Sequence, residues 1–112
     1  RGARELSRLV HAMGGDGDTI YGLSHLGDYE ATLFSPHSNN RRYGEAVVRG
    51  TAGGFHKIAE GVYTAEALMA LAAEYRVELP ICTTVYEIVA HGCDPRAQLM
   101  QLFLRRNKSE KE

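Results

Sequence analysis

The sequence predicts an all-α protein that folds as one compact domain of several helices. Apolar residues recur three and four positions apart along most of the chain, as they do on one face of an amphipathic helix. No segment shows the sustained alternation of apolar and polar residues that is typical of a strand, so we expect no sheet. A chain of 112 residues is long enough to bury one core, which favours a single domain over residues 1–112.

The N-terminal part of the chain is predicted to form a helix followed by shorter helical segments. Residues 3–13 carry an apolar face made of Leu6, Leu9, Val10 and Met13. Gly14–Gly15 ends this helix, because glycine enters the left-handed conformation of a helix end at little cost. Asp16 can then cap a short helix that ends at Gly22.

The stretch GLSHLGDYEATLFSPHSNNRRYG, residues 22–44, combines a carboxylate, a hydroxyl and several donors that suit anions. Gly27 is the next predicted break, and Asp28 opens a short helical segment that Pro36 ends. Thr32 follows Asp28 by one turn and therefore lies on the same side of the helix. Taken alone, Asp28 could be a helix cap and Thr32 an ordinary helix residue.

Ser38 is a predicted N-cap for a helix over about residues 39–48 that Gly50 closes. The start of a helix presents unpaired backbone N–H groups and a partial positive charge, so it suits a phosphate group. Arg41 and Arg42 add full positive charges nearby, although two adjacent arginines could equally form a solvated face.

The C-terminal half contains a turn and three predicted helices. Thr51–Gly54 is the flexible turn, and helices follow over about residues 60–75, over about residues 81–91, and from the cap and first-turn proline at Asp94–Pro95. The residues expected to face inward on these helices are Val62, Leu68, Leu71, Ala72, Tyr75, Val85, Ile88, Val89, Leu99, Leu102 and Phe103. The charged tail from Arg105 is expected to fray.

Composition excludes several classes of protein. Thirteen basic residues against fourteen acidic ones leave a net charge of −1, which gives no basic footprint for nucleic acid or a membrane surface. No apolar run approaches the roughly 20 residues that a membrane span needs. Cys82 and Cys93 lack the close spacing of metal ligands, so we expect reduced, buried thiols of a cytoplasmic protein. His11 is expected to be packed or on the surface, and we expect no metal site.

The segment LGDYEATLFSPHSNNRRYG resembles the substrate-site segment of bacterial NAD(P)-dependent glycerol-3-phosphate dehydrogenases, whose pattern is roughly GLGDLxLTCxSxxSRNRRFG. FHKIAEGVYTAEAL is similar to the family's IGQVVEGVRTAKAV, and VELPICTTVYEIVAHGCDPRAQLMQLF to its VEMPITEAVYAVLFEGKDPREAVEALL. RGARELSRLVHAMG is similar to TRGLAEMTRLGVALG. These matches keep their order and spacing over nearly the whole chain, and they imply the fold of the 6-phosphogluconate dehydrogenase C-terminal-like helical domain.

The resemblance implies a second, N-terminal domain that binds NAD or NADP through a glycine-rich βαβ turn. Residues 1–112 match only the helical C-terminal substrate domain, and they contain no GxGxxG motif. The family's catalytic lysine precedes the first residue here, and Lys57, Lys108 and Lys111 do not align with it. We therefore expect a piece of a longer polypeptide that is inactive alone. The resemblance implies that the full-length enzyme interconverts sn-glycerol 3-phosphate and dihydroxyacetone phosphate for phospholipid synthesis, as a cytoplasmic homodimer.

The resemblance also assigns roles to single residues. Asp28 would support and orient the catalytic lysine, with Thr32 in the same hydrogen-bond network. A lysine that acts as a general base near neutral pH needs a lowered pKa, which its immediate neighbours set. The positions implied to bind substrate are Asp28, Ser38, Asn39, Asn40 and Arg41, and those implied to contact the cofactor are Asn39, Ile58 and Glu60.

One position departs from the family pattern. Where the family reads Ser-Arg-Asn-Arg-Arg, residues 38–42 read Ser-Asn-Asn-Arg-Arg, so Asn39 replaces the arginine that holds phosphate in the family. One of the two following arginines, His25 or His37 could supply the charge instead. Asn39 therefore leaves open an enzyme of this architecture that acts on another small hydroxy or phosphorylated compound. A third class is a non-catalytic helical interaction or nucleic-acid module, against which the absence of a basic excess argues.

Overall fold

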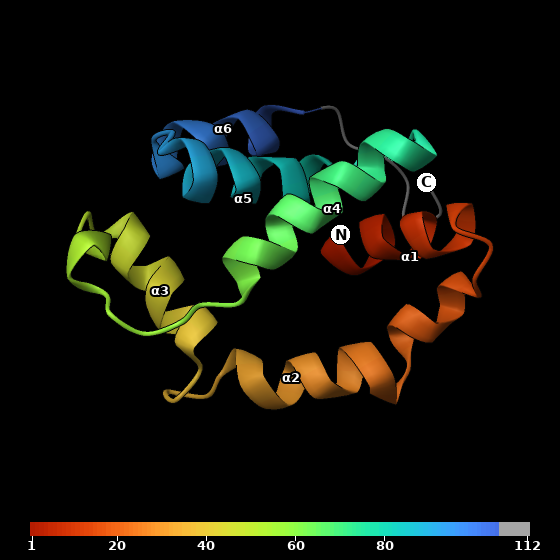
Figure 1. The fold of residues 1–112 in the computed structure, drawn as a ribbon, viewed down its shortest axis with the longest axis horizontal. Helices are drawn as coiled ribbons and strands as arrows, with labels where there is room; N and C mark the ends of the chain where they lie inside the picture. Colours follow the sequence, from red (N-terminus) through yellow and green to blue (C-terminus); the bar gives the residue numbers. More distant parts are fainter. Residues whose placement is uncertain (106–112) are drawn as a thin grey trace.

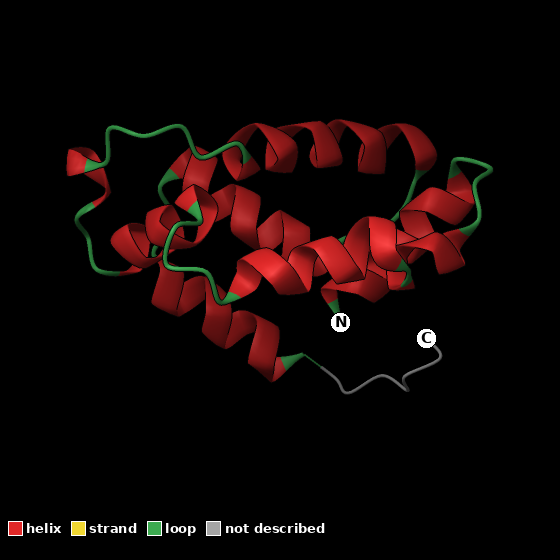
Figure 2. Ribbon diagram, turned by 90° about the horizontal axis from the view of Figure 1, so that it is seen from below, coloured by secondary structure: helices red, strands yellow, loops and turns green. Residues whose placement is uncertain are grey.

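The computed structural model describes residues 1–105, and this part of the chain contains helices and turns but no strand. Figure 2 shows helices joined by loops throughout, which confirms the predicted fold class. The α-helices are α1 (Gly2–Ala12), α2 (Asp28–Leu33), α3 (Asn39–Val48), α4 (Gly61–Tyr75), α5 (Pro80–His91) and α6 (Pro95–Leu104). Shorter helical turns are η1 (Gly17–Tyr21), η2 (Leu23–Gly27) and η3 (Ala52–Gly54). The predicted fraying concerns the tail from Arg105, of which residues 106–112 lie outside the described residues.

Helix α4 forms the centre of the domain, with α1 and α5 packed against it and α6 packed against α5 (Figure 1). The buried apolar residues in the described part of the chain are Leu9, Ala59, Ala65 and Leu79. Ala65 is the buried residue of α4, and its small side chain lets the neighbouring helices approach closely.

Helix α2 lies along the side of the domain opposite α5 and α6 (Figure 1). It is connected to the centre through a series of local contacts: α2 packs on η2, η2 on η1, and η1 on α1. Helix α3 packs on η3 and on α6. The stretch that contains the candidate site residues therefore forms an outer layer, while the core of the domain is built from α1, α4 and α5.

The predicted break at Gly27 is wrong. Gly27 has helical dihedral angles, φ −63° and ψ −44°, and its N–H donates to the Gly22 carbonyl oxygen at 3.2 Å. The chain passes from the π-helical turn η2 into α2 without a break, because an isolated glycine inside a helix costs only about 1 kcal/mol relative to alanine. The predicted break at Gly22 is confirmed, since this residue caps η1.

Several predicted inward-facing residues are exposed instead, and the physical reason is the same for all of them. These residues are Met13, Tyr75, Val85, Leu99 and Phe103, with Phe103 reaching 80% exposure. Helical periodicity identifies an apolar face, but it does not say whether another helix covers that face. Conversely, the polar residues Ser7 and Thr84 are buried, and neither burial was predicted. The turn predicted at Thr51–Gly54 contains the helical turn η3.

Helix α5 begins on a residue that is distant in the sequence. Leu79 precedes it without a side-chain cap, and the buried carboxylate of Glu5 on α1 accepts hydrogen bonds from the first amides of the helix instead. Glu5 Oε1 and Oε2 lie 2.8 and 2.9 Å from the Ile81 nitrogen, and Oε2 lies 3.2 Å from the Cys82 nitrogen. This contact joins α1 to α5, and local sequence patterns did not predict it.

The two cysteines are free thiols, as predicted, and each is half-buried. Burial raises the pKa of Cys82 to about 11, and the neighbouring Glu5 carboxylate adds to the shift through its charge and its hydrogen bond. Cys93 lies at the other end of α5, where Glu87 pairs with His91 at 2.9 Å. That hydrogen bond holds the pKa of Glu87 below its usual value.

Candidate functional site

The Asp28 carboxylate is exposed and makes no hydrogen bond or ion pair with any residue in the described range 1–105. The reading of Asp28 as a helix cap is wrong, because the capping position of α2 is Gly27 and no side chain caps it. The continuous helix through η2 already supplies acceptors for the first amides of α2, so a cap has no function there. Asp28 therefore carries a charged group whose hydrogen-bonding capacity is not used within residues 1–105.

Thr32 lies one turn after Asp28, as predicted, but its hydroxyl group points back to its own helix. Thr32 Oγ1 donates to the carbonyl oxygen of Tyr29 at 3.2 Å, with the Asp28 carbonyl oxygen at 3.5 Å. This back-bonding is common for threonine inside a helix. The hydroxyl proton is thereby used, while the oxygen can still accept a hydrogen bond from a group above α2.

Ser38 is the N-cap of α3, as predicted. Its Oγ accepts from the Arg41 backbone nitrogen at 3.3 Å, in the N-cap geometry that serine favours. The Ser38 hydroxyl proton is not needed for this bond, so it can donate to an oxygen of a ligand. Asn39, the first residue of α3, is half-buried beside it.

The side chains of Asn40 and Arg41 each reach to another segment. Asn40 Oδ1 accepts from the Gly61 nitrogen, the first amide of α4, at 2.9 Å. Arg41 Nη1 donates to the Phe34 carbonyl oxygen at the end of α2 at 2.8 Å, and its Nε lies 3.1 Å from Glu45 Oε1. These bonds place the start of α3 against the end of α2 and the start of α4.

Ile58 and Glu60 lie on the loop that leads into α4. Ile58 is 72% exposed, and Glu60 is an exposed N-cap residue without a capping side chain. The bond from Asn40 to Gly61 holds this loop beside α3, and the rings of Tyr43 and Phe55, with centroids 5.4 Å apart, pack the same two segments together. The structure therefore brings the loop and the start of α3 together, as the predicted roles of their residues require.

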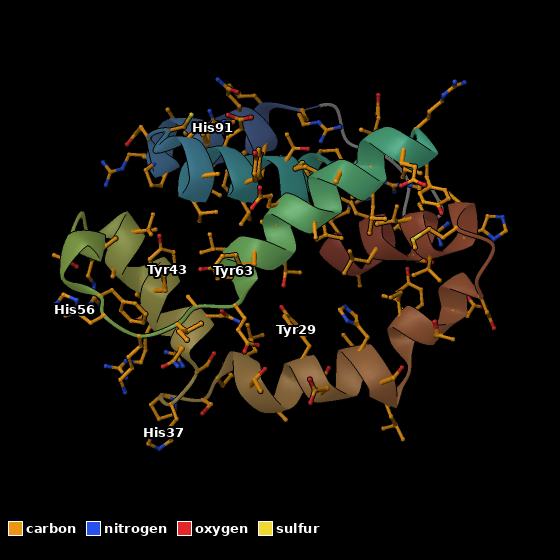
Figure 3. All side chains as sticks on the ribbon, in the orientation of Figure 1. Tyr29, His37, Tyr43, His56, Tyr63 and His91 are labelled. Carbon is orange, nitrogen blue, oxygen red and sulfur yellow. The ribbon has the colours of Figure 1, made fainter. Side chains whose placement is uncertain are left out.

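The aromatic and histidine side chains around this region separate into an inner and an outer group. Figure 3 shows Tyr29 pointing from α2 toward the side where α4 begins, with Tyr63 on α4 and Tyr43 on α3. His37 and His56 lie at the outer edge of the molecule in the same view. His25 stacks on Tyr29, with ring centroids 6.4 Å apart. His37 directly precedes Ser38, the N-cap of α3, and its side chain projects outward in this view.

Sequence reasoning missed the bonds of Asn40 and Arg41 to distant segments. One signal could have pointed to the first of them: Glu60 is a poor N-cap residue, so the amides that open α4 need an acceptor from elsewhere. No comparable signal predicted the bond from Arg41 to the end of α2.

Residues 1–100 match the family described as "NAD-dependent glycerol-3-phosphate dehydrogenase C-terminus". The glycerol-3-phosphate dehydrogenase (NAD(P)+) of Thermus thermophilus is 42% identical over 113 residues, which cover 98% of this chain and 35% of the relative. The enzyme of the same name from Deinococcus radiodurans is also 42% identical, over 100% of this chain and 34% of the relative. The enzyme of the same name from Chlorobium limicola is 37% identical, over 98% of this chain and 34% of the relative.

Fold and similarity together define the chain as an all-α C-terminal domain of the dehydrogenase class. It belongs to the NAD-dependent glycerol-3-phosphate dehydrogenase C-terminal family. The chain spans about a third of the length of the curated relatives it matches. Within residues 1–105, no helix has the length and apolar character to cross a membrane, and no cluster of three His, Cys, Asp or Glu residues could hold a metal ion.

Proposed function

We propose that this chain is the substrate domain of an NAD(P)-dependent glycerol-3-phosphate dehydrogenase, which interconverts sn-glycerol 3-phosphate and dihydroxyacetone phosphate. Membership of the family and the printed names of the relatives support the reaction. The arrangement of α2, α3 and the loop before α4 supports the division of roles among the residues. The proposal includes a dinucleotide-binding domain elsewhere in the enzyme, a cytoplasmic location, a homodimer and a supply of precursor for phospholipids.

The observation that carries the proposal is the exposed Asp28 carboxylate. A carboxylate without a partner in its own domain is a suitable contact for a cation that another part of the enzyme supplies. In the proposed enzyme that cation is the catalytic lysine. Asp28 orients the lysine ammonium group by hydrogen bonding, and the Thr32 oxygen accepts a further bond from the same group.

The phosphate of the substrate is placed at the start of α3. The unpaired amides of this ten-residue helix and the Ser38 hydroxyl proton are donors for phosphate oxygens. The amide groups of Asn39 and Asn40 add neutral donors. Arg41 contributes charge at short range, although its Nε and Nη1 atoms are already bonded to Glu45 and Phe34.

The cofactor is placed next to the loop before α4. Ile58 offers an exposed apolar side chain for a ring edge, and the exposed carboxylate of Glu60 can accept from a hydroxyl or amide group of a nucleotide, so the residues present fit a nicotinamide dinucleotide. When bound, NAD or NADP supplies or accepts the hydride. Asn39 directly precedes Asn40, whose side chain bonds to Gly61 at the end of this loop, and this closeness supports assigning the Asn39 amide to both substrate and cofactor.

The replacement of the family's arginine by Asn39 favours a second candidate, an enzyme of the same architecture that acts on another small hydroxy or phosphorylated compound.

The deciding experiment measures NADH and NADPH oxidation with dihydroxyacetone phosphate by the protein expressed from the complete reading frame. The main proposal is supported if turnover is faster with dihydroxyacetone phosphate than with non-phosphorylated dihydroxyacetone. No turnover with either compound, in a folded protein that binds NADH, would contradict it. Residues 1–112 alone are expected to be inactive.

Asn39→Arg is expected to lower the KM for dihydroxyacetone phosphate. Hydrogen bonds to charged groups contribute roughly 1.5–3 kcal/mol against about 1 for neutral ones. The difference of about 0.5–2 kcal/mol corresponds to a roughly two- to thirtyfold lower KM, since 1.4 kcal/mol is tenfold. Steady-state kinetics of the complete enzyme measures this change, with non-phosphorylated dihydroxyacetone as the control substrate.

A KM that stays unchanged or rises in Asn39→Arg would show that another cation already fills the anion site. Arg42 is then the next residue to replace, because its exposed side chain makes no bond within residues 1–105. A sharp rise of KM in Arg42→Ala would transfer the phosphate contact to that residue.

A further inference from the structure

Within residues 1–105, the side chains of Asn40 and Arg41 form direct polar links between three segments that the proposed function assigns to different tasks. Helix α2 carries Asp28, the start of α3 carries Ser38, and the loop before α4 carries Ile58. Asn40 bonds to the first amide of α4, and Arg41 bonds to the carbonyl group of Phe34, the C-cap residue of α2. We propose that Asn40 and Arg41 are positioning residues that set the substrate segment against the lysine-supporting helix and the cofactor loop.

The bond from Asn40 to Gly61 supplies an acceptor that the local sequence lacks. The first amides of a helix have no partner inside it, and Glu60 provides no capping side chain. Asn40 Oδ1 fills this role from 21 residues away. A methyl group on Gly61 would lie 3.2 Å from Asn40 Oδ1 and 3.3 Å from its Cγ, so the two segments are in close contact at this point.

The same bond orients the Asn40 amide. Oδ1 accepts from the Gly61 N–H, while Nδ2 makes no hydrogen bond within residues 1–105. The side chain can therefore present its NH₂ group to a substrate oxygen while its carbonyl group holds the cofactor loop. A change in this one residue is expected to disturb both ligands.

Arg41 has a matching role at the end of α2. The last carbonyl groups of a helix lack partners and carry partial negative charge, so they favour a cation. Arg41 Nη1 donates to the Phe34 carbonyl oxygen at 2.8 Å. The Nε of Arg41 lies 3.1 Å from Oε1 of Glu45, which follows one turn later on α3. The guanidinium group is thus fixed at two points, and it sets the end of α2 against α3.

The inference rests on the proposed function, but its first test does not require activity. Hydrogen exchange of the Gly61 amide is measured in the protein from the complete reading frame. Asn40→Ala is expected to speed this exchange by at least about fivefold, because the acceptor is lost. Asn40→Asp is expected to keep the amide protected, because a carboxylate oxygen accepts the same bond. Equal exchange in the wild-type protein and in Asn40→Ala would overturn the role of Asn40, whatever the reaction is.

Kinetics separates positioning from simple substrate binding. Asn40→Ala is expected to raise the KM for the dinucleotide as well as that for dihydroxyacetone phosphate. Arg41→Ala is expected to lower kcat roughly tenfold, because displacement of α2 misplaces Asp28, and a misplacement of about 1 Å can cost up to a hundredfold in rate. Arg49→Ala, which removes a positive charge at the far end of α3, is the control. It is expected to leave kcat and both KM values unchanged.

Two kinetic results would overturn the inference while leaving the proposed function intact. A rise in the KM for dihydroxyacetone phosphate alone, in both Asn40→Ala and Arg41→Ala, would make the two residues substrate ligands only. An effect of Arg49→Ala equal to that of Arg41→Ala would show that the loss of charge, and not of the link to α2, is responsible. Lack of turnover in the wild-type protein would instead contradict the proposed function, and the exchange experiment would still decide the role of Asn40.

Discussion

Replacement of Asp28 by asparagine is expected to lower kcat of the complete enzyme about a hundredfold, since correctly placed acid–base groups contribute roughly 10²–10⁴. The KM for NADH or NADPH should stay the same, because the cofactor contacts are assigned to Asn39, Ile58 and Glu60. The melting temperature should change little, because the proposed contact with the lysine is the one that the complete enzyme would lose. The Asp28 carboxylate caps no helix and makes no bond within residues 1–105, so the domain loses no contact.

In the proposed enzyme, the expected loss of turnover follows from a change in the protonation and orientation of the lysine. In that enzyme, reduction of dihydroxyacetone phosphate needs a protonated lysine that donates to the carbonyl oxygen, whereas the reverse oxidation needs the neutral amine as general base. A neighbouring carboxylate favours the charged form of an amine, so Asp28 supports the reduction and does not itself lower the pKa of the lysine. Without that carboxylate, the pKa of the lysine falls. The pH at which kcat for reduction begins to decline should therefore shift downward in Asp28→Asn, and a pH profile of kcat measures this shift.

Glu30 provides a matched control on the same helix. It lies in the first turn of α2, is exposed, and carries the same charge as Asp28. Glu30→Gln therefore removes an equal charge from the same region and is expected to leave kcat unchanged. A normal kcat in Asp28→Asn, or an equal loss in Glu30→Gln, would contradict the assignment of Asp28 to the lysine.

The features that the sequence predicted well are local. Ser38 and Asp94 cap α3 and α6 through bonds to amides three residues later, and Asp16 caps η1 in a similar way. Each cap involves residues within one turn, so composition and spacing are sufficient to identify it. The error at Gly27 is also local, and there two rules compete: glycine can end a helix, but it is tolerated inside one when the amides on both sides find acceptors.

The features that the sequence did not predict depend on which helices meet. Glu5 reads as a polar residue on the exposed side of an amphipathic helix, yet it is 5% exposed and bonds to α5, 76 residues away in the sequence. The sequence motif around Asn40 indicates a ligand-binding residue, but it gives no sign of the bond from Asn40 to Gly61. Periodicity carries no information on the pairing of helices, so neither contact could be derived from it.

Replacement of Glu5 by alanine is expected to destabilise the protein by about 2–4 kcal/mol, because hydrogen bonds to charged groups contribute roughly 1.5–3 kcal/mol each and unpaired buried amides carry a further cost. The variant leaves the Ile81 and Cys82 amides without their acceptor at the start of α5. Thermal and denaturant unfolding of the complete protein measures the loss. Glu78→Ala, which removes an exposed carboxylate just before α5, is the control and is expected to cost less than about 0.5 kcal/mol.

Glu5→Gln separates the charge of this side chain from its volume, and Cys82 reports the difference. In the wild-type protein, burial and the Glu5 carboxylate raise the pKa of Cys82 from 9.0 to about 11, so the thiol stays protonated at pH 8 and should be alkylated slowly. A raised thiol pKa also means that its contribution to stability is complete below pH 9 and is lost as the pH rises toward 11.

Glutamine keeps an acceptor for Ile81 but carries no charge, so the pKa of Cys82 should fall while burial still holds it above 9.0. The pH dependence of alkylation in a Cys93→Ser background, where Cys82 is the remaining cysteine, measures both values. A midpoint near 9 in the presence of Glu5, or the same midpoint with glutamate and glutamine, would show that the carboxylate does not face the start of α5.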